Sequence, residues 1–249
     1  MVNTLLIMGI AHVIGDFLFQ SESLANEKKK KQKSLLVHAL LYTLAMSLLF
    51  VCIRWNYALL PLVIIVFSHW IIDNIKIKIE QKLNNPKWLL ITFCTDQCLH
   101  LAIIIVCWIV FVSHAQTTIW FSSLCARSWF QTALLYLAMF AIIWDPTSVF
   151  IKKVFCLFPI EDQRIGSKEE EKTTSIRTGE LIGKLERLIV AALVLNGAAA
   201  SIGFVLTAKS VARFKQFDDK DFAERYLVGT LLSVSIALCI VLIGEKMIT

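Results

Sequence analysis

The sequence predicts an all-α integral membrane protein, a polytopic bundle of six to seven transmembrane helices. Hydrophobic residues make up 57% of the 249 residues and charged residues only 18%, whereas a soluble domain is about half apolar and a quarter charged. Apolar stretches recur that approach or exceed the roughly 20 residues a helix needs to cross a bilayer. Lys and Arg flank these stretches, so the net charge of +6 indicates membrane orientation and no nucleic-acid partner.

The candidate transmembrane helices follow one another along the whole chain, at residues 3–20, 35–53, 57–79, 88–112, 131–157, 187–207 and 227–244. The first one carries His12 and Asp16, lacks a basic leader and has no small-residue cleavage site. We therefore expect it to be a retained helix in the lipid bilayer and not a signal peptide.

Basic residues set the expected orientation of the first four helices. Lysines crowd residues 27–33, between the first two helices, and recur after the third at Lys76, Lys78, Lys82 and Lys87. By the positive-inside rule both loops face the cytoplasm, so the N-terminus is expected outside. We expect the run Lys28–Lys33 to face lipid headgroups and to serve orientation, or to attract an anionic substrate.

The second half of the chain is less regular. Pro146 interrupts the stretch 131–157, and proline breaks or kinks a helix. The loop 208–226 carries five basic residues but would lie outside by simple counting. One of the two preceding stretches is therefore expected not to cross, and we favour the one with proline. Residues 159–186 are expected to form a charged cytoplasmic linker or surface helix, and the small residues of 196–203 allow a homo-oligomer.

We expect two regions, a four-helix bundle at 1–115 that carries a polar site and a C-terminal membrane region at 116–249. Four polar pairs inside apolar stretches predict the site. Each pair is spaced by four residues and so lies on one face of a helix. The pairs are His12 with Asp16, His38 with Tyr42, His69 with Asp73, and Asp96 with His100. On the expected topology all four lie ~5–18 Å below the cytoplasmic surface, which predicts one shared pocket.

Carboxylates at membrane depth require compensation, because even one charged residue there costs at least ~2.5–3.5 kcal/mol. Lys76 can neutralise one carboxylate if it folds back, and one or two divalent ions would balance the three. Imidazoles are common metal ligands, and the mixed set favours Zn²⁺, with Mn²⁺ or Fe²⁺ as alternatives. The expected ligands are His12, Asp16, His69, Asp73, Asp96 and His100, with His38 as a further ligand or a proton carrier. The alternative is a polar network that only holds the bundle together.

These motifs resemble a known family. The order His12-x-x-x-Asp16, His38, His69-x-x-x-Asp73 and Asp96-Gln97-x-x-His100 is similar to that of the bacterial membrane family labelled domain of unknown function 3307. The second half, from Gly183 to Ser233, resembles its longer members. The resemblance implies a multi-pass protein of the bacterial cytoplasmic (inner) membrane. The His/Asp pattern is also similar, more distantly, to that of membrane-bound metal-dependent hydrolases, although likeness of pattern does not prove activity.

The leading hypothesis is a metal-dependent hydrolase in which a metal-bound water attacks an ester or phosphoester presented from the cytoplasmic leaflet. Lys76 would stabilise the developing anionic charge. Two alternatives from other classes stay open. One is an ion- or proton-coupled transporter, because membrane acids and histidines also serve transport. The other is a membrane sensor or anchor that docks a cytosolic protein partner through 159–186 and the lysine-rich loops.

Overall fold

A computed structural model describes residues 2–83, 85–158 and 169–248, with side chains described from residue 178 onward in the last range. Within these ranges the chain is helical and contains no strand beyond an isolated bridge between Ile53 and Thr117. It forms two compact units, Met1–Ala141 and Ile142–Thr249. The all-α fold is therefore confirmed. The expected domain boundary at 115/116 stays a prediction.

Apolar helices of membrane-spanning length occur in both units. Five described helical segments are long and apolar enough to cross a bilayer: Gln32–Cys52, Trp55–Leu83, Pro86–Val112, Ser128–Phe155 and Lys220–Ile248. Val2–Leu18 and Ser201–Ala212 are apolar but shorter. The number of spans expected from the sequence, six to seven, stays a prediction.

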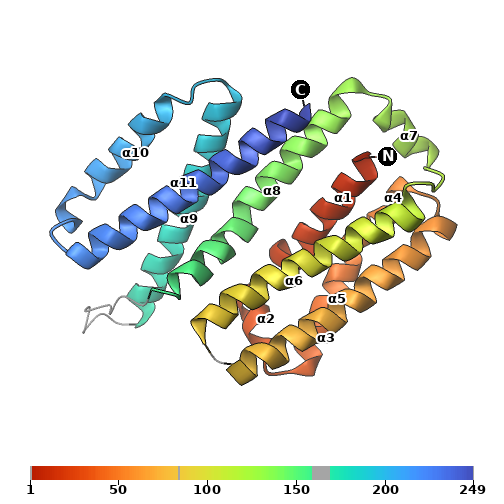
Figure 1. The fold of residues 1–249 in the computed structure, drawn as a ribbon, viewed down its shortest axis with the longest axis horizontal. Helices are drawn as coiled ribbons and strands as arrows, with labels where there is room; N and C mark the ends of the chain where they lie inside the picture. The colour runs from red at the N-terminus through yellow and green to blue at the C-terminus, as the bar shows by residue number, and fades with distance from the viewer. Residues whose placement is uncertain (1, 84, 159–168, 249) are drawn as a thin grey trace. The chain divides into compact units, whose positions relative to one another are not determined.

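The first unit is built on four long helical segments that run side by side (Figure 1). In chain order its elements are α1 (Val2–Val13), the π-helix η1 (Ile14–Leu18), α2 (Glu22–Glu27), α3 (Gln32–Met46), α4 (Leu49–Cys52), α5 (Trp55–Leu83), α6 (Pro86–Cys107), the π-helix η2 (Trp108–Val112) and α7 (Ile119–Cys125). Side chains cap three of the starts. Ser21 accepts from Leu24 N before α2, Asn85 accepts from Lys87 N before α6, and Thr118 accepts from Phe121 N before α7.

The first unit has an apolar core on one side of its polar residues and an apolar exterior. Met8, Met46, Ile65 and Ile104 belong to the buried cluster between α1, α3, α5 and α6. Large apolar side chains on the outer faces of the same helices are exposed, for example Phe67 at 60%. Polar groups inside and apolar groups outside suit a bundle surrounded by lipid.

In the second unit the proline-containing helix is continuous, which corrects the expected break at Pro146. Helix α8 runs from Ser128 to Phe155 through Pro146. Proline cannot donate to the carbonyl of Ile142, and the hydroxyl of Thr147 donates to that oxygen instead, at 2.8 Å. The neighbouring carbonyl of Ile143 accepts from Arg187 Nε at 2.9 Å. The hydroxyl of Thr147 thus replaces the backbone bond that proline removes, and Arg187 adds a side-chain bond to the next carbonyl.

The break in the second half falls later in the chain than expected. Helix α9 (Glu169–Leu195) ends before Gly197, which has a φ of +70°, and α10 (Ser201–Ala212) begins four residues further on. The expectation of one helix over 187–207 was therefore wrong, because Gly197 adopts a left-handed conformation that ends the helix. The short 3-10 turn η3 (Phe214–Gln216) leads to α11 (Lys220–Ile248), which packs on α9.

The charged segment expected at 159–186 lies partly outside the described residues. From residue 169 its backbone is helical and belongs to α9. The backbone is thus helical, and the position of this segment at the surface stays a prediction. The cytosolic partner and the homo-oligomer stay predictions.

Candidate metal centre in the first unit

Four helical segments each contribute one of the predicted polar pairs to a single buried cluster. Helix α1 and η1 carry His12 and Asp16, α3 carries His38 and Tyr42, α5 carries His69 and Asp73, and α6 carries Asp96 and His100. All eight residues are at most 6% exposed. The structure thus brings together, in one place, every histidine and aspartate singled out in these stretches. Lys76 joins them through Asp96.

The first pair sits where α1 widens into a π-helix. The backbone of Phe19 donates to the Ile14 carbonyl five residues earlier, at 2.9 Å. Such single π-turns are frequently found at functional sites. Gly15 lies inside the turn against α3. A Cβ at this position would come within 2.8 Å of Tyr42 Cδ2 and 3.2 Å of Ala45 Cβ. The missing side chain therefore lets the turn that carries Asp16 approach α3.

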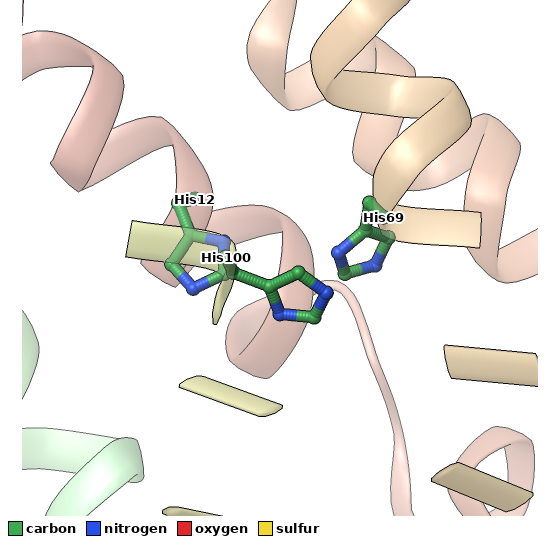
Figure 2. A group of neighbouring side chains, drawn as sticks. All are labelled: His12, His69 and His100. Carbon is green, nitrogen blue, oxygen red and sulfur yellow. The ribbon is translucent and has the colours of Figure 1, made fainter. Parts of the chain in front are cut away.

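Three imidazoles from α1, α5 and α6 converge at the centre of the cluster (Figure 2). The rings of His69 and His100 have centroids 4.3 Å apart, and those of His12 and His100 are 5.4 Å apart. His38 approaches from α3, with its Nε2 3.2 Å from Nε2 of His69. These four histidines therefore point their nitrogens into one small volume.

Three overlapping groups of side chains have geometry suited to a metal ion. They are His12, His69 and His100; Asp16, His38 and His69; and Asp16, Asp96 and His100, each with ligand atoms within 4.8 Å of one another. Asp16, His69 and His100 each belong to two of the three groups. They come from different helical segments, so they form the inner part of the cluster. Asp73 belongs to none of the groups.

Several buried polar atoms in the cluster lack a hydrogen-bond partner. They are both ring nitrogens of His100, the Nδ1 atoms of His38 and His69, and the Oδ1 atoms of Asp73 and Asp96. Buried polar atoms are paired in most proteins, and leaving one unpaired costs about 1–3 kcal/mol. Six such atoms in one buried cluster indicate a ligand with several coordination positions. A metal ion meets that description.

Gln97 organises the cluster from α6. Its Nε2 donates to Asp16 Oδ2 at 2.7 Å and to Asp96 Oδ2 at 3.1 Å. This orientation turns Oε1, which can only accept, towards His12 Nε2 at 3.2 Å. His12 Nε2 therefore carries the proton, and its Nδ1 accepts from the Tyr42 hydroxyl at 3.1 Å. Both nitrogens of His12 are engaged, so His12 could become a ligand only by exchanging one of these bonds.

The part of the chain that carries the cluster is similar to a known protein family. Residues 4–127 match the model of a family described as protein of unknown function (DUF3307). The match covers just under half of the chain, and this N-terminal part is similar to the family. The resemblance seen in the sequence is thereby confirmed for the residues that form the cluster. The match ends at 127, so the likeness of the second half to longer members stays a prediction. The comparisons with curated proteins and with solved structures gave no match.

Two lysines of the DUF3307 region form ion pairs with carboxylates of the cluster. Lys28 Nζ donates to Asp73 Oδ2 at 2.7 Å, and Lys76 Nζ donates to Asp96 Oδ2 at 2.6 Å. The expectation that Lys28 faces lipid was wrong, because its side chain is only 8% exposed and reaches inward. Lys76 pairs across to α6 and does not fold back on Asp73. The sequence predicted one cationic partner for the carboxylates, Lys76, and the structure adds a second, Lys28.

The segment that holds Lys28 is fixed to α5 and α3 on both sides of this residue. Lys29 Nζ lies 3.4 Å from Glu80 Oε2, and Gln81 Nε2 donates to the Lys29 carbonyl at 2.6 Å. Ser34 donates to Glu27 Oε2 at 3.1 Å. No sequence signal separates Lys28 from its basic neighbours, because its burial depends on how this segment folds over α5.

Proposed function

We propose that the His/Asp cluster is a metal centre inside a membrane helical bundle, and that it hydrolyses an ester or phosphoester. The single observation that carries the metal centre is the set of partnerless nitrogen and oxygen atoms on His38, His69, His100, Asp73 and Asp96. Imidazole nitrogens with carboxylate oxygens suit Zn²⁺, and Mn²⁺ or Fe²⁺ also accept them.

The ligand set that requires the least rearrangement excludes His12, whose nitrogens are both engaged. Asp16 Oδ1 lies 3.4 Å from His38 Nε2 and 3.9 Å from His69 Nε2. Asp96 Oδ1 lies 3.9 Å from His100 Nε2. These five side chains offer more donors than the three that a catalytic zinc site takes from the protein. Three of them can bind the ion and leave the fourth position to water, as hydrolysis requires.

The bound ion would lower the pKa of its water towards about 7 and so supply the attacking hydroxide. Two ammonium groups stand beside the cluster. Lys76 is 18% exposed at its side chain and uses one of its three N–H groups on Asp96. Its remaining donors suit the anionic oxygen that develops during attack on an ester or phosphoester.

We place the centre in the bacterial cytoplasmic membrane, near its cytoplasmic face. The apolar exterior of α3, α5 and α6 supports the bilayer environment. The lysines that follow α2 and those at the end of α5 support a cytoplasmic position for that end of the bundle, with the N-terminus outside. A substrate would then reach the centre from the cytoplasmic leaflet.

Metal content of the purified protein tests the centre. We expect bound metal in the wild type and its loss in Asp16→Asn and in His69→Ala. The matched control is His114→Ala, because His114 lies outside the cluster and has no part in any of the three groups. Equal and negligible metal in all four proteins would refute the metal centre. Equal and substantial metal in all four would place the metal elsewhere.

A turnover assay tests the hydrolase separately. Metal-loaded wild type is offered a chromogenic carboxylic ester, a phosphomonoester and a phosphodiester in detergent. We expect hydrolysis of at least one and none by Asp16→Asn. Metal bound at the centre without turnover of any of the three would leave the centre standing and refute the hydrolase.

A second function is favoured by the position of His38. Its Nε2 lies 3.4 Å from Asp16 Oδ1 and 3.4 Å from Asp73 Oδ2. A proton on this imidazole would be shared between two carboxylates, as in a relay of a proton-coupled transporter. Proton uptake by proteoliposomes that contain metal-free wild type, abolished by His38→Gln, would support this function. Proton uptake equal to that of empty liposomes would refute it.

A further inference from the structure

The charges of the cluster do not cancel. Asp16, Asp73 and Asp96 contribute three negative charges, and Lys28 and Lys76 contribute two positive charges. The histidines are neutral when they act as ligands. The five charged side chains therefore leave one net negative charge in a largely buried cluster.

This imbalance is not offset by the next charged residues. Glu80 is buried nearby on α5, but it is engaged with Lys29 at 3.4 Å and with the hydroxyl of Thr92 at 3.2 Å. The five charged residues of the cluster are 18% exposed or less at their side chains. Charges interact strongly in such surroundings, because water does not screen them.

We propose that Lys28 and Lys76 limit the centre to one divalent cation accompanied by one singly charged anion. This inference depends on the proposed metal centre and adds its stoichiometry and ligand class. One divalent ion with a hydroxide carries one positive charge, which matches the single negative charge of the pocket. A second divalent ion would leave an excess of positive charge that only more anions could offset.

The geometry of the carboxylates supports the same stoichiometry. Asp73 and Asp96 each give Oδ2 to a lysine and keep Oδ1 free. Asp16 gives Oδ2 to Gln97 and turns Oδ1 towards His38. Each carboxylate therefore has one oxygen that no lysine or Gln97 occupies. Two ions would require carboxylates that bridge or chelate, and the lysines and Gln97 occupy the second oxygens.

The limit of one singly charged anion beside the metal ion also restricts the class of substrate. Hydroxide is the resting ligand and the attacking group, so a substrate that binds beside it should add as little charge as possible. A neutral ester adds none and a phosphodiester adds one negative charge, whereas a phosphomonoester adds close to two at neutral pH. We therefore expect the centre to favour a phosphodiester or a neutral ester over a phosphomonoester.

Metal stoichiometry in lysine variants tests the proposal. Purified proteins are titrated with Zn²⁺ by calorimetry, and bound zinc is counted per chain. We expect one ion in the wild type. Lys28→Met and Lys76→Met each add one net negative charge and free one carboxylate oxygen. Each should bind the ion about tenfold tighter or more, or bind a second ion.

Three further variants separate charge from structure. Lys28→Met/Asp73→Asn removes both partners and restores the net charge, so it should again bind one ion with an affinity near that of the wild type. Lys30→Met and Lys78→Met remove exposed lysines of the same two segments and should bind as the wild type does. If a single lysine variant fails to fold, Lys76→Arg and the double variant still give the comparison.

The outcomes distinguish this inference from the proposed metal centre. No zinc in the wild type refutes the centre itself. Two ions in the wild type leave the centre standing and overturn the inference. One ion in every variant, with unchanged affinity in Lys28→Met and Lys76→Met, also overturns it, because the lysines would then have no influence on the charge.

The anion is tested with azide on cobalt-loaded protein. Azide carries one negative charge, and the visible absorption of cobalt responds to a change of its ligands. We expect one azide to bind per cobalt in the wild type, and weaker binding in Lys76→Met, where one positive charge is lost. A spectrum that does not respond to azide would overturn the anion part of the proposal.

Discussion

The phenol ring of Tyr42 stacks face to face on the imidazole of His69, with ring centroids 3.7 Å apart and only 1° between the ring planes. Tyr42 also donates its hydroxyl proton to His12 Nδ1, as the orientation of Gln97 requires. One fully buried side chain thereby sets the ring plane of a candidate ligand and the tautomer of its neighbour. This relationship separates two roles that mutation can test.

Tyr42→Phe should keep the stacked ring and lose the hydrogen bond to His12. His12 donates to Gln97, which holds the ligand carboxylates of Asp16 and Asp96. The loss therefore acts on the ion through Gln97 and should lower metal affinity by less than the roughly 10–100-fold typical of a ligand's direct partner. Tyr42→Leu, which also removes the stack, should lower it further. Zinc titration of both variants and the wild type measures the effect. An affinity of Tyr42→Phe equal to that of the wild type would show that the tautomer of His12 has no influence on the ion.

Gly15→Ala should damage the site through packing. The added Cβ would meet Tyr42 Cδ2 at 2.8 Å and push η1 away from α3. Overpacking of this kind costs about 1–3 kcal/mol of folding free energy. The control is Gly9→Ala in α1, where an added Cβ meets nothing within 4 Å. Thermal unfolding in detergent should show a lower midpoint for Gly15→Ala alone. Equal midpoints would mean that η1 is free to shift.

Arg187→Met should destabilise the second unit. Besides Ile143, Arg187 donates to the Trp144 carbonyl at 3.1 Å and to Ser148 at 2.5 Å. Its loss removes these buried side-chain donors from the turn around Pro146, and each buried polar group left unsatisfied costs about 1–3 kcal/mol.

Two variants control the Arg187 prediction. Arg187→Lys keeps the charge but cannot donate in a planar fork, so it should recover only part of the loss. Arg54→Met removes an exposed arginine in the first unit and should leave the unfolding midpoint unchanged. Full stability of Arg187→Lys would show that charge alone matters at this position.

Acid should weaken the contact between α8 and α9 at Glu180. Burial raises the pKa of this carboxyl, but Lys152 at 2.7 Å and Lys184 at 3.3 Å outweigh it and hold the pKa below its ordinary value. A lowered pKa means that the stabilisation is complete above the unfolded-state pKa of about 4.3 and disappears as the pH falls through the folded-state pKa.

Unfolding midpoints measured from neutral to acid pH test the Glu180 prediction. The difference between wild type and Glu180→Gln should be largest near neutral pH and should shrink as the pH falls towards about 3. The difference should be modest, because pairs of this exposure contribute about 0–1 kcal/mol. A difference that is constant with pH would assign the effect to packing.

The sequence by itself determined the class of fold and the residues of the cluster. Composition and apolar length predicted a helical membrane protein, and the four-residue spacing of His12 with Asp16, and of the other pairs, predicted polar faces that meet. Both inferences depend on the spacing of residues along a helix and on the cost of placing polar groups in an apolar medium. Spacing and polarity can both be read from the sequence.

Only the tertiary structure decided which polar groups satisfy one another. Lys28 looked like its exposed neighbours, because a run of lysines does not reveal which one will meet a carboxylate from α5. Pro146 looked like a helix breaker, because local sequence does not show that the hydroxyl of Thr147 will donate to the Ile142 carbonyl. The break fell instead at Gly197. Hydrogen bonds and ion pairs between distant segments depend on how the helices pack, and local sequence does not show that packing.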